Sequence, residues 1–508
     1  MRRIPLIFLL LIGSTSFSAS GKAAEFSRLG YKAEILDEKD DIDPPKLPDL
    51  TAYTVENLKA HIPAPREGEI DIVKMSEILG LKEFLKDGGI DKFTTLQGNT
   101  PSAIRIKKGV YTLEMLEKAV NDKKVLSCNH QVCLLSLPVY VGAEATLSLK
   151  EKDDLRLNSN TGAMITVEGV VTSVGATIEG WDAEKDHPSA YEHDKVFRPF
   201  LSFWKGSKAY MTGSTLRDMG YDDFKSYGLS FSSNGDLNKR KSQDVWLIEN
   251  HIEGLYYGFY TYEASGIVVL NNKFIRNIYY GIDPHDRSDK LIITGNDVSE
   301  SLKRHGIILS REVNNSWVFN NKSYKNTGSG IMVDRSSAGN VVAYNDVHDN
   351  AREGIYIAES IETKLYGNKI YKNGKNGIRV RNSWAILSYQ DDVEDNAEYG
   401  IYAYSVALEH LERDFERDPY MKKLELSVRR SKFHRNKKGV FKVGNADHIR
   451  LSGINADKDS IDTFFYGDLG FFRGAASDAA LDENKTVELT NYRNIPGSVK
   501  KVPDAAKR

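Results

Sequence analysis

The chain contains 508 residues, with 69 Lys and Arg against 71 Asp and Glu, which gives a formal net charge of −2 at pH 7. This balance excludes a global basic field for nucleic acid, so locally placed cations would have to meet any anionic ligand. Length alone predicts several domains, but a solenoid is exempt because each repeat contacts only its neighbours.

Residues 1–23 are predicted to be a secretory signal peptide. Arg2 and Arg3 precede an apolar run that ends at Ile12, and small residues follow, so cleavage is expected near Ser20–Ala24. The apolar run is too short to span a bilayer, and no later stretch is long and apolar enough to do so. We therefore expect an exported chain that is soluble and has no membrane span once the leader is removed.

Residues 24–100 carry few strand signals and are predicted to form an N-terminal segment and cap. The Pro44-Pro45 pair marks extended chain, and Met75–Lys86 has the pattern of a short amphipathic helix. An open end of a stacked β-structure exposes backbone edges that need a cover. We expect this helix to cover the N-terminal end of a solenoid.

Cys128 and Cys133 are the only two cysteines, five residues apart. In an exported protein this spacing favours a disulfide that closes a small turn. A metal site that adds His130 would be one ligand short for structural zinc, and a free thiol pair is the third alternative. We expect the disulfide and no metal at this turn.

Two residues set the period of the central chain. Gly followed by Ile, or once by Phe, recurs every 23 to 25 residues, and an Asn precedes it with a spacing of 22 to 25. Two phases that keep one period over this length indicate a repeat architecture. The glycines are Gly258, Gly281, Gly306, Gly330, Gly354, Gly377 and Gly400, and the asparagines are Asn250, Asn272, Asn296, Asn321, Asn345 and Asn368.

Alternating apolar residues after each Gly predict short strands. In Gly281–Asp286 the first and third residues after Gly are apolar and the second and fourth are polar, which is typical of a half-buried strand. A unit of this length has no room for a helix and must stack on its neighbours. A helical solenoid needs longer repeats, and the leucine-rich pattern is absent. The sequence predicts an all-β, right-handed parallel β-helix of 23–25-residue coils, with Asn ladders inside or at one corner and Gly at another, chosen for positive φ or close approach.

The β-helix is assigned to residues 101–475, the candidate catalytic domain. A short helical insert is predicted near 406–420, where charged residues break the register. Residues 476–508 are polar and Lys-rich, and we expect them to form a loosely held C-terminal tail.

Residues at equal offsets from each Gly should form lines along the outer face. The second residues are Tyr260, Asp283, Ile308, Met332, Tyr356, Arg379 and Tyr402. The fourth are Tyr262, His285, Ser310, Asp334, Ala358, Arg381 and Tyr404. Just beyond are Glu263, Asp286, Arg311, Arg335, Glu359, Asn382 and Ser405. Rings beside guanidinium groups, with Met332 taken as an exposed apolar residue, favour a platform for an acidic sugar polymer.

His285 is the candidate general base, because an imidazole accepts protons near neutral pH. Asp283, on the same face, is predicted to orient the ring, and Arg311, one coil later, is placed to hold a carboxylate. Two alternatives remain open on these residues alone. They are a solvated charge cluster that stabilises stacked coils, and a metal site that adds Asp286 and Asp289, although the spacing matches no calcium or zinc signature.

Two segments, Gly281–Asp289 and Arg304–Arg311, closely resemble the periplasmic mannuronan C5-epimerases of alginate-producing bacteria. Arg198–Trp204 and Ser226–Ser230 fit the same family, and the resemblance extends over about 100–475. It implies conversion of polymer-bound β-D-mannuronate to α-L-guluronate in the periplasm during alginate biosynthesis, without a cofactor or calcium.

The resemblance implies that His285 takes the C5 proton and that Arg311 neutralises the substrate carboxylate, which stabilises an enolate-like intermediate. The resemblance also implies that Asp283 and Asp286 position the base. The expected substrate-binding residues are Asp283, Asp286, Tyr260, Tyr262, Asp334, Arg335, Tyr356, Arg379 and Arg381. The expected partner is an anionic polysaccharide, polymannuronate or alginate, beside other periplasmic secretion proteins for which the sequence carries no interface motif.

Two rival functions stay open. A polyuronate lyase uses the same base and the same neutralised carboxylate but then expels the C4 oxygen. A non-catalytic scaffold would bind the polysaccharide in the periplasm and leave its composition unchanged. Only the family resemblance favours epimerisation over elimination.

Overall fold

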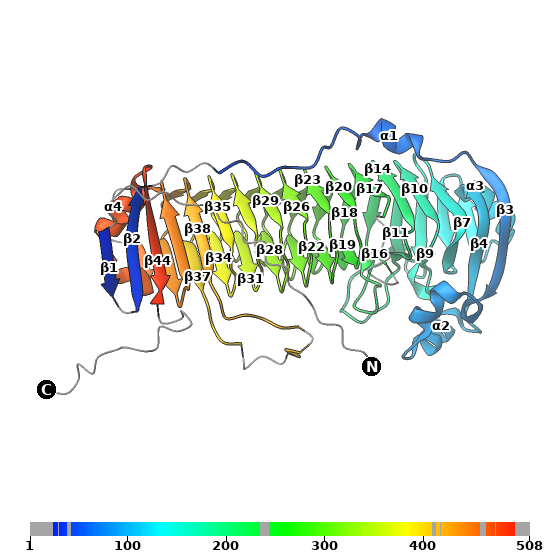
Figure 1. Cartoon of the computed structure of the whole chain (residues 1–508). Helices are drawn as coiled ribbons and strands as arrows, with labels where there is room; N and C mark the ends of the chain where they lie inside the picture. The colour runs from blue at the N-terminus through cyan, green and yellow to red at the C-terminus, as the bar shows by residue number, and fades with distance from the viewer. Residues whose placement is uncertain are drawn as a thin grey trace, which may run out of the picture.

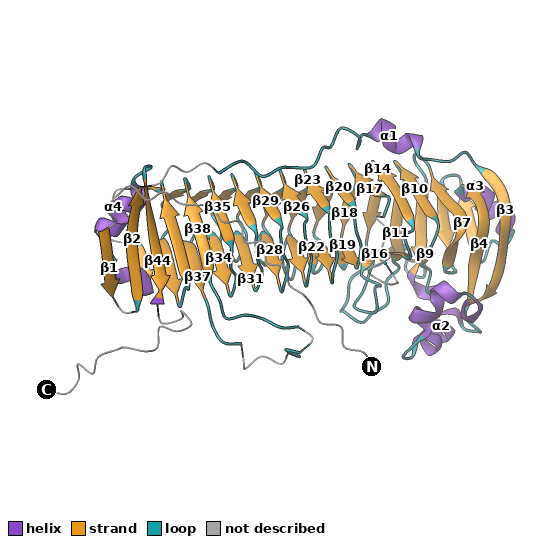
Figure 2. Ribbon diagram, viewed as in Figure 1, coloured by secondary structure: helices purple, strands orange, loops and turns teal. Residues whose placement is uncertain are grey.

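Coils stacked along one axis give the chain the shape of a rod (Figure 1). The computed structural model describes residues 24–28, 30–37, 42–233, 243–408, 413–416, 418–457, 464–472 and 474–492. The predicted signal peptide lies outside them. Strands dominate, and the helices lie at the ends and on the outside of the rod (Figure 2). Among the described residues, no helix is long and apolar enough to cross a bilayer.

Three stacks of short strands form the walls, and nearly all of their pairings are parallel, as the predicted parallel β-helix requires. The exceptions are the antiparallel pairs at the edge of the third stack. The first stack contains β9 (Ile165–Val167), β13 (Leu201–Phe203), β16 (Gly228–Ser232), β19 (Tyr257–Tyr262), β22 (Tyr280–His285), β25 (Ile307–Ser310), β28 (Ile331–Asp334), β31 (Ile355–Ala358), β34 (Ile378–Arg381), β37 (Tyr399–Tyr404), β40 (Gly439–Gly444) and β43 (Phe465–Gly467). The second contains β10 (Val170–Val174), β14 (Lys208–Thr212), β17 (Val245–Ile248), β20 (Val268–Leu270), β23 (Ile292–Thr294), β26 (Trp317–Phe319), β29 (Val341–Ala343), β32 (Lys364–Tyr366), β35 (Ile386–Tyr389), β38 (Glu425–Arg429) and β41 (His448–Ser452). The third contains β5 (Leu126–Asn129), β6 (Val132–Leu135), β8 (Asp154–Asn158), β11 (Thr177–Asp182), β15 (Thr215–Arg217), β18 (His251–Glu253), β21 (Lys273–Ile275), β24 (Asp297–Ser299), β27 (Lys322–Tyr324), β30 (Asp346–His348), β33 (Lys369–Tyr371), β36 (Asp392–Glu394), β39 (Lys432–His434) and β42 (Asn455–Ala456), with β12 (His187–Pro188) beside β11.

Buried asparagines form the predicted ladder inside the coils. The amide of Asn321 donates to Oδ1 of Asn345 at 3.0 Å, and Asn345 repeats the contact with Asn368. The ladder starts at Asn250 and ends on Asp391, which accepts from Asn368. Each rung satisfies a buried backbone N–H as well as a side-chain amide. The ladder therefore fixes the register of successive coils.

The repeated glycines allow close approach of neighbouring coils. Their φ angles are not positive, unlike those of Gly295 and Gly367. A Cβ on Gly330 would lie 2.3 Å from Cγ1 of Val347. Of the two roles that the sequence allowed these glycines, close approach is the one observed.

The N-terminal end is closed by β3 (Arg66–Lys74), β4 (Ser102–Tyr111), β7 (Val139–Leu149) and α3 (Leu113–Val120). The helix predicted over Met75–Lys86 is instead two 3₁₀ segments, η1 (Met75–Glu77) and η2 (Leu79–Leu85). The break falls at Ile78, whose backbone is extended, and Gly80 lies against the ring of Tyr140, where a Cβ would be 2.5 Å away. These segments pack with α2 (Gly89–Gln97) and η3 (Ser159–Thr161) on the flank of the first coils. The prediction that they cover the N-terminal end of the solenoid is therefore wrong. The Cys128–Cys133 disulfide is present across β5 and β6, as expected.

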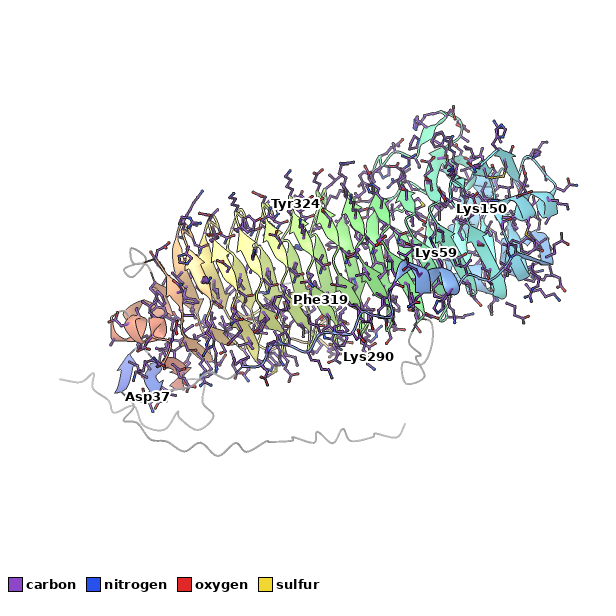
Figure 3. All side chains as sticks on the ribbon, turned by 90° about the horizontal axis from the view of Figure 1, so that it is seen from above. Asp37, Lys59, Lys150, Lys290, Phe319 and Tyr324 are labelled. Atoms are coloured by element: carbon purple, nitrogen blue, oxygen red, sulfur yellow. A yellow bond between two sulfur atoms is a disulfide. The ribbon has the colours of Figure 1, made fainter. Side chains whose placement is uncertain are left out.

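The chain before α1 runs along the length of the rod. Asp37 lies near one end and Lys150 near the other, and Lys59 of α1 (Val55–Ala60) lies over the second stack close to the Lys150 end (Figure 3). Between Asp37 and α1, Leu47 and Leu50 pack on an outward apolar strip of the second stack that includes Phe319. The N-terminal segment therefore contacts both ends of the solenoid.

Residues 476–492 form a helix and a paired strand, contrary to the prediction of a loosely held tail from 476. After η6 (Asp468–Phe471), α4 (Ala475–Leu481) leads to β44 (Lys485–Asn491), which pairs with β41 and with β2 (Tyr31–Asp37), itself paired with β1 (Ala24–Arg28). Val487 and Leu489 alternate inward and are fully buried, which explains the strand. The residues after 492 lie outside the described chain.

The predicted helical insert is not seen in its described residues. Residues 406–408, 413–416 and 418–420 form loops and turns, and 409–412 and 417 lie outside the described residues. The backbone of Val406 exchanges two hydrogen bonds with Asn382, and Leu408 donates to the hydroxyl of Tyr420. These contacts fix the described residues on both sides of the segment to the first stack and to each other.

Candidate active site

The register of the first stack places the predicted lines of side chains side by side. Tyr262 is the partner of His285, which pairs with Ser310, which in turn pairs with Asp334. Tyr260 pairs with Asp283 in the adjacent line. Parallel strands lie about 4.8 Å apart, so residues at one offset form a row along the rod.

Left-handed backbone follows these strands and carries two of the candidate residues. Asp286 has a φ of 35° and Arg311 a φ of 63°. Such residues cost about 1–2 kcal/mol unless their surroundings hold them. Here the backbone N–H of Asp286 donates to the backbone carbonyl of Ser310 at 3.0 Å. The backbone N–H of Arg311 donates to the backbone carbonyl of Asp334 at 3.1 Å. Hydrogen bonds between coils thus hold both residues in this geometry.

The carboxylate of Asp286 lies between the candidate base and the candidate cation. Its Oδ2 accepts from Nδ1 of His285 at 2.8 Å, and its Oδ1 lies 3.7 Å from Nε of Arg311. The side chain of Arg311 is 43% exposed, against 22% for His285. Of the two carboxylates expected to position the ring, Asp286 is therefore the one that accepts a hydrogen bond from it. Arg311 keeps most of its charge available to a ligand.

Opposing effects set the protonation of this pair. Burial favours the neutral ring of His285, but the hydrogen bond that the ring donates to Asp286 and the charges of Asp283 and Asp286 outweigh burial and raise the pKa of His285 above 6.5. Burial opposes ionisation of Asp286, yet contact with His285 and the nearby arginines lowers its pKa below 3.8. The imidazole is thus paired with an ionised carboxylate.

Asp283 lies deeper than predicted. It is 1% exposed, its Oδ1 has no hydrogen-bond partner among the described residues, and burial raises its pKa to about 7. The next residues in its row, Ile308, Met332 and Tyr356, are each less than a tenth exposed and cluster with Tyr280. The prediction that Met332 is exposed is therefore wrong.

Tyr260 and Tyr262 are not open stacking faces either. Tyr260 is 6% exposed and contacts the rings of Tyr227 and His285. The ring of Tyr262 lies beneath the ammonium of Lys225, and its hydroxyl accepts from Arg287 at 3.1 Å. Tyr260 thus packs on His285, and Tyr262 is its strand partner. Lys225 was not singled out from the sequence.

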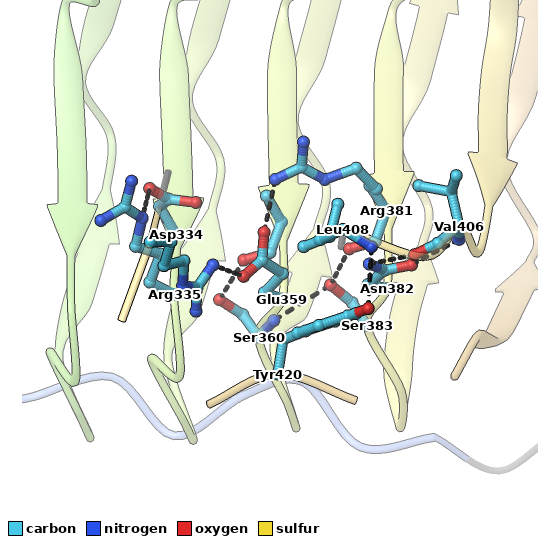
Figure 4. A network of polar contacts seen from close by, with 12 residues as sticks. Asp334, Arg335, Glu359, Ser360, Arg381, Asn382, Ser383, Val406, Leu408 and Tyr420 are labelled. Atoms are coloured by element: carbon cyan, nitrogen blue, oxygen red, sulfur yellow. Dashed lines mark hydrogen bonds and ion pairs between the residues drawn. The ribbon is translucent and has the colours of Figure 1, made fainter. Parts of the chain in front are cut away.

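Acidic side chains partly neutralise the predicted row of arginines (Figure 4). Arg381 donates to Glu359 at 2.5 Å, and Glu359 also accepts from Arg413. Arg335 lies 3.6 Å from Asp334 and 3.3 Å from Asp418.

On the same strand as Arg381, Arg379 donates to Glu353 at 3.1 Å and its guanidinium lies over the ring of Tyr356. Glu353 and Glu359 are nearly inaccessible, and neither was predicted to matter. Among the predicted arginines Arg311, Arg335, Arg379 and Arg381, the weakest carboxylate contact is consequently that of Arg311.

A metal alternative at Asp283, His285, Asp286 and Asp289 gains no support. Across the described ranges, no group of three His, Cys, Asp or Glu side chains is arranged to hold a metal ion. Asp286 is already engaged with His285 and Arg311. The chemistry of this site is therefore that of an imidazole, a carboxylate and a guanidinium.

Comparison with known proteins agrees with this fold. A family profile described as a right handed beta helix region matches residues 258–407, which gives the class and the hand of the solenoid. A mannuronan C5-epimerase of Pseudomonas putida is 36% identical over 422 residues, 82% of this chain and 81% of the relative. One from Pseudomonas aeruginosa is 38% identical over 418 residues, 81% and 77% of the two chains. The crystal structure of a periplasmic alginate epimerase, AlgG, superposes with a TM-score of 0.76 at 36% identity, covering 80% of this chain and 99% of that one. The chain belongs to the mannuronan C5-epimerase family and is an isomerase.

Proposed function

We propose that this chain inverts C5 of β-D-mannuronate residues within alginate, with His285 as general base and Arg311 as the cation on the substrate carboxylate. The observation that carries this proposal is the contact of Asp286 with both side chains, at 2.8 Å and 3.7 Å, on the outer face of stacked coils. Family membership supplies the reaction class, since the relatives are named as acting on mannuronan.

His285 is arranged to accept a proton through its second ring nitrogen. A carboxylate can only accept a hydrogen bond, so Nδ1 of the neutral ring donates to Asp286 and leaves the lone pair on Nε2. The C5 proton of a uronate is acidified by the adjacent carboxyl group. Removal of this proton by Nε2 yields an enolate-like intermediate with added charge on the carboxylate oxygens.

Arg311 is suited to stabilise that charge. Its side chain is 43% exposed, and its contact with Asp286 is long at 3.7 Å, so a substrate carboxylate can pair with the guanidinium. A cation fixed where charge develops lowers the barrier more than it aids ground-state binding. Return of a proton to the opposite face of C5 then completes the inversion, and we propose water as the donor.

We further propose that the enzyme acts in the periplasm. The predicted leader at residues 1–23 and the likeness to a periplasmic alginate epimerase support this location. There the polymer is exported as it is made, so secretion proteins are the partners we expect beside the polysaccharide.

Proton NMR of polymannuronate treated with the purified mature chain tests the assignment. Guluronate signals should appear without ultraviolet absorbance from unsaturated ends, and His285→Ala should abolish them while polymer binding persists. Absorbance with shortened chains would assign a lyase instead. Binding with unchanged composition would assign a scaffold, and full turnover by His285→Ala would refute the role of His285.

A further inference from the structure

Lys225 is a buried cation at the edge of the site. It lies in the turn between β15 and β16 and is 6% exposed. Its Nζ lies 3.7 Å from the centroid of the Tyr262 ring, and 5.0 and 5.1 Å from the rings of Trp204 and Phe224. Within the described part of the chain, these rings are the contacts of the ammonium, and no carboxylate forms an ion pair with it.

This environment leaves the charge of Lys225 poorly compensated. A cation–π contact stabilises an ammonium by less than its removal from water costs. Burial accordingly lowers the pKa of Lys225 to about 8, although Glu263 and Asp286 act in the opposite direction. A cation kept in such surroundings beside a catalytic group is typical of a site that receives its counter-ion from a ligand.

The nearby carboxylates are already committed to other cations. Glu263 pairs with Arg287 at 2.7 Å, and Asp286 accepts from His285 at 2.8 Å. Neither carboxylate can pair with Lys225 without losing the contact that it already makes. The missing anion is therefore expected from outside the chain.

Lys225 lies close to His285, the proposed base, along the first stack. Tyr262, which lies beneath the ammonium, is the direct strand partner of His285 on the N-terminal side of its coil. Arg311 follows Ser310, the partner of His285 on the other side. The base thus lies between two cations along the rod.

We propose that Lys225 binds the carboxylate of the polymer residue next to the one whose C5 reacts. This neighbouring residue lies toward the N-terminal end of the rod from His285. Arg311 then holds the reacting residue and Lys225 holds its neighbour, so the two cations set the register of the polymer over the base. The identity of the anion as a polyuronate rests on the proposed function. The need for an anion at Lys225 rests on its burial and contacts.

The test compares Lys225→Met, which keeps the length of the side chain and removes the charge, with Lys225→Arg, which keeps the charge. Lys205→Met is the matched control, because Lys205 lies on the same flank but is exposed and paired with Glu168 at 3.0 Å. Each variant is measured for its melting temperature, for affinity toward mannuronate oligomers by calorimetry, and for KM and kcat by NMR at two salt concentrations.

Lys225→Met should weaken oligomer affinity and raise KM about tenfold, with kcat changed by less than about twofold. Its KM should also depend less on salt, because one screened charge contact is lost. Lys225→Arg should restore most of the affinity, and Lys205→Met should resemble the wild type.

Unchanged affinity with a lower melting temperature in Lys225→Met would overturn the proposal and make Lys225 a packing residue. If the wild-type chain produced no guluronate, the proposed function would fail, but the oligomer titration would still decide the role of Lys225. Loss of affinity in Lys225→Met would then support a polyuronate contact, and equal affinity would overturn it.

Discussion

Nδ1 of His285 donates to Oδ2 of Asp286 at 2.8 Å, and this contact determines which ring nitrogen is free to accept a proton. The pairing depends on a left-handed residue, since Asp286 has a φ of 35° and directly follows the strand that presents His285. Backbone hydrogen bonds to the next coil hold this turn. The stacking of coils thus sets the geometry of the proposed base as well as the fold.

The rate should therefore rise with pH through a value above 6.5, because a protonated His285 cannot accept the C5 proton and its pKa is raised. Asp286→Asn removes a negative charge and the carboxylate acceptor, so the pKa of His285 should fall and the acid limb should move to lower pH. The maximal rate should also fall about tenfold or more, because the ring loses its orientation. NMR initial rates across a pH series measure both effects, and an acid limb that stays in place in Asp286→Asn would contradict this account.

Arg311 and Arg335 should respond differently to removal of charge. Arg311 has one long carboxylate contact, at 3.7 Å, whereas Arg335 lies near both Asp334 and Asp418. Arg311→Ala should lower kcat by about a hundredfold or more, as expected for a group that stabilises developing charge. Arg335→Ala should mainly raise KM. Similar loss of kcat in both variants would show that the charge of the whole groove matters rather than this one contact.

The period of the sequence predicts the fold well because one pattern controls three physical features. Spaced glycines allow close approach, as at Gly330, asparagines such as Asn345 form the buried ladder, and alternation directs Ile282 inward. The register that follows from this period also places His285, Asp286 and Arg311 near each other. Only coordinates could reveal that Asp286, and not Asp283, contacts the ring, because the turn after the strand redirects its side chain.

Contacts that the sequence repeat does not specify could not be predicted from the sequence. Strand β2 pairs with β44 across the whole length of the chain, and no repeat relates the two segments. Glu353 and Glu359 neutralise Arg379 and Arg381 through choices of side-chain rotamer. The buried ammonium of Lys225 depends on a turn between coils, which the repeat does not specify.

Close approach at the repeated glycines predicts a large difference between two Gly→Ala variants. In Gly330→Ala the new methyl would lie 2.3 Å from Val347 and 2.7 Å from the amide of Asn350, so it should destabilise the chain by about 1–3 kcal/mol or more. Gly444→Ala is the control, because its nearest neighbour would be 3.7 Å away, and it should change stability by less than about 0.5 kcal/mol. Urea denaturation of both variants measures the difference, and equal stability would show that neighbouring coils can separate at little cost.

Asp391 is an acid at a position where the preceding coils have asparagine. It accepts from the amide of Asn368 at 2.8 Å and from Ser388 at 2.6 Å, and burial raises its pKa from 3.8 to about 6. The folded chain therefore binds this proton more tightly than the unfolded chain does. Stability from the protonated form is complete below about pH 4 and is lost as the pH rises through about 6.

Asp391→Asn should stabilise the fold at neutral pH by about 1–3 kcal/mol, because the amide keeps the acceptor oxygen and carries no charge. The gain should shrink toward acidic pH, where the wild-type carboxyl is protonated. Asn345→Asp, the reverse exchange in an earlier coil, should impose the same penalty with the same pH dependence. Denaturation of the three proteins at acidic and neutral pH measures both effects. A gain from Asp391→Asn that did not change with pH would show that hydrogen-bond geometry, and not ionisation, limits this rung of the ladder.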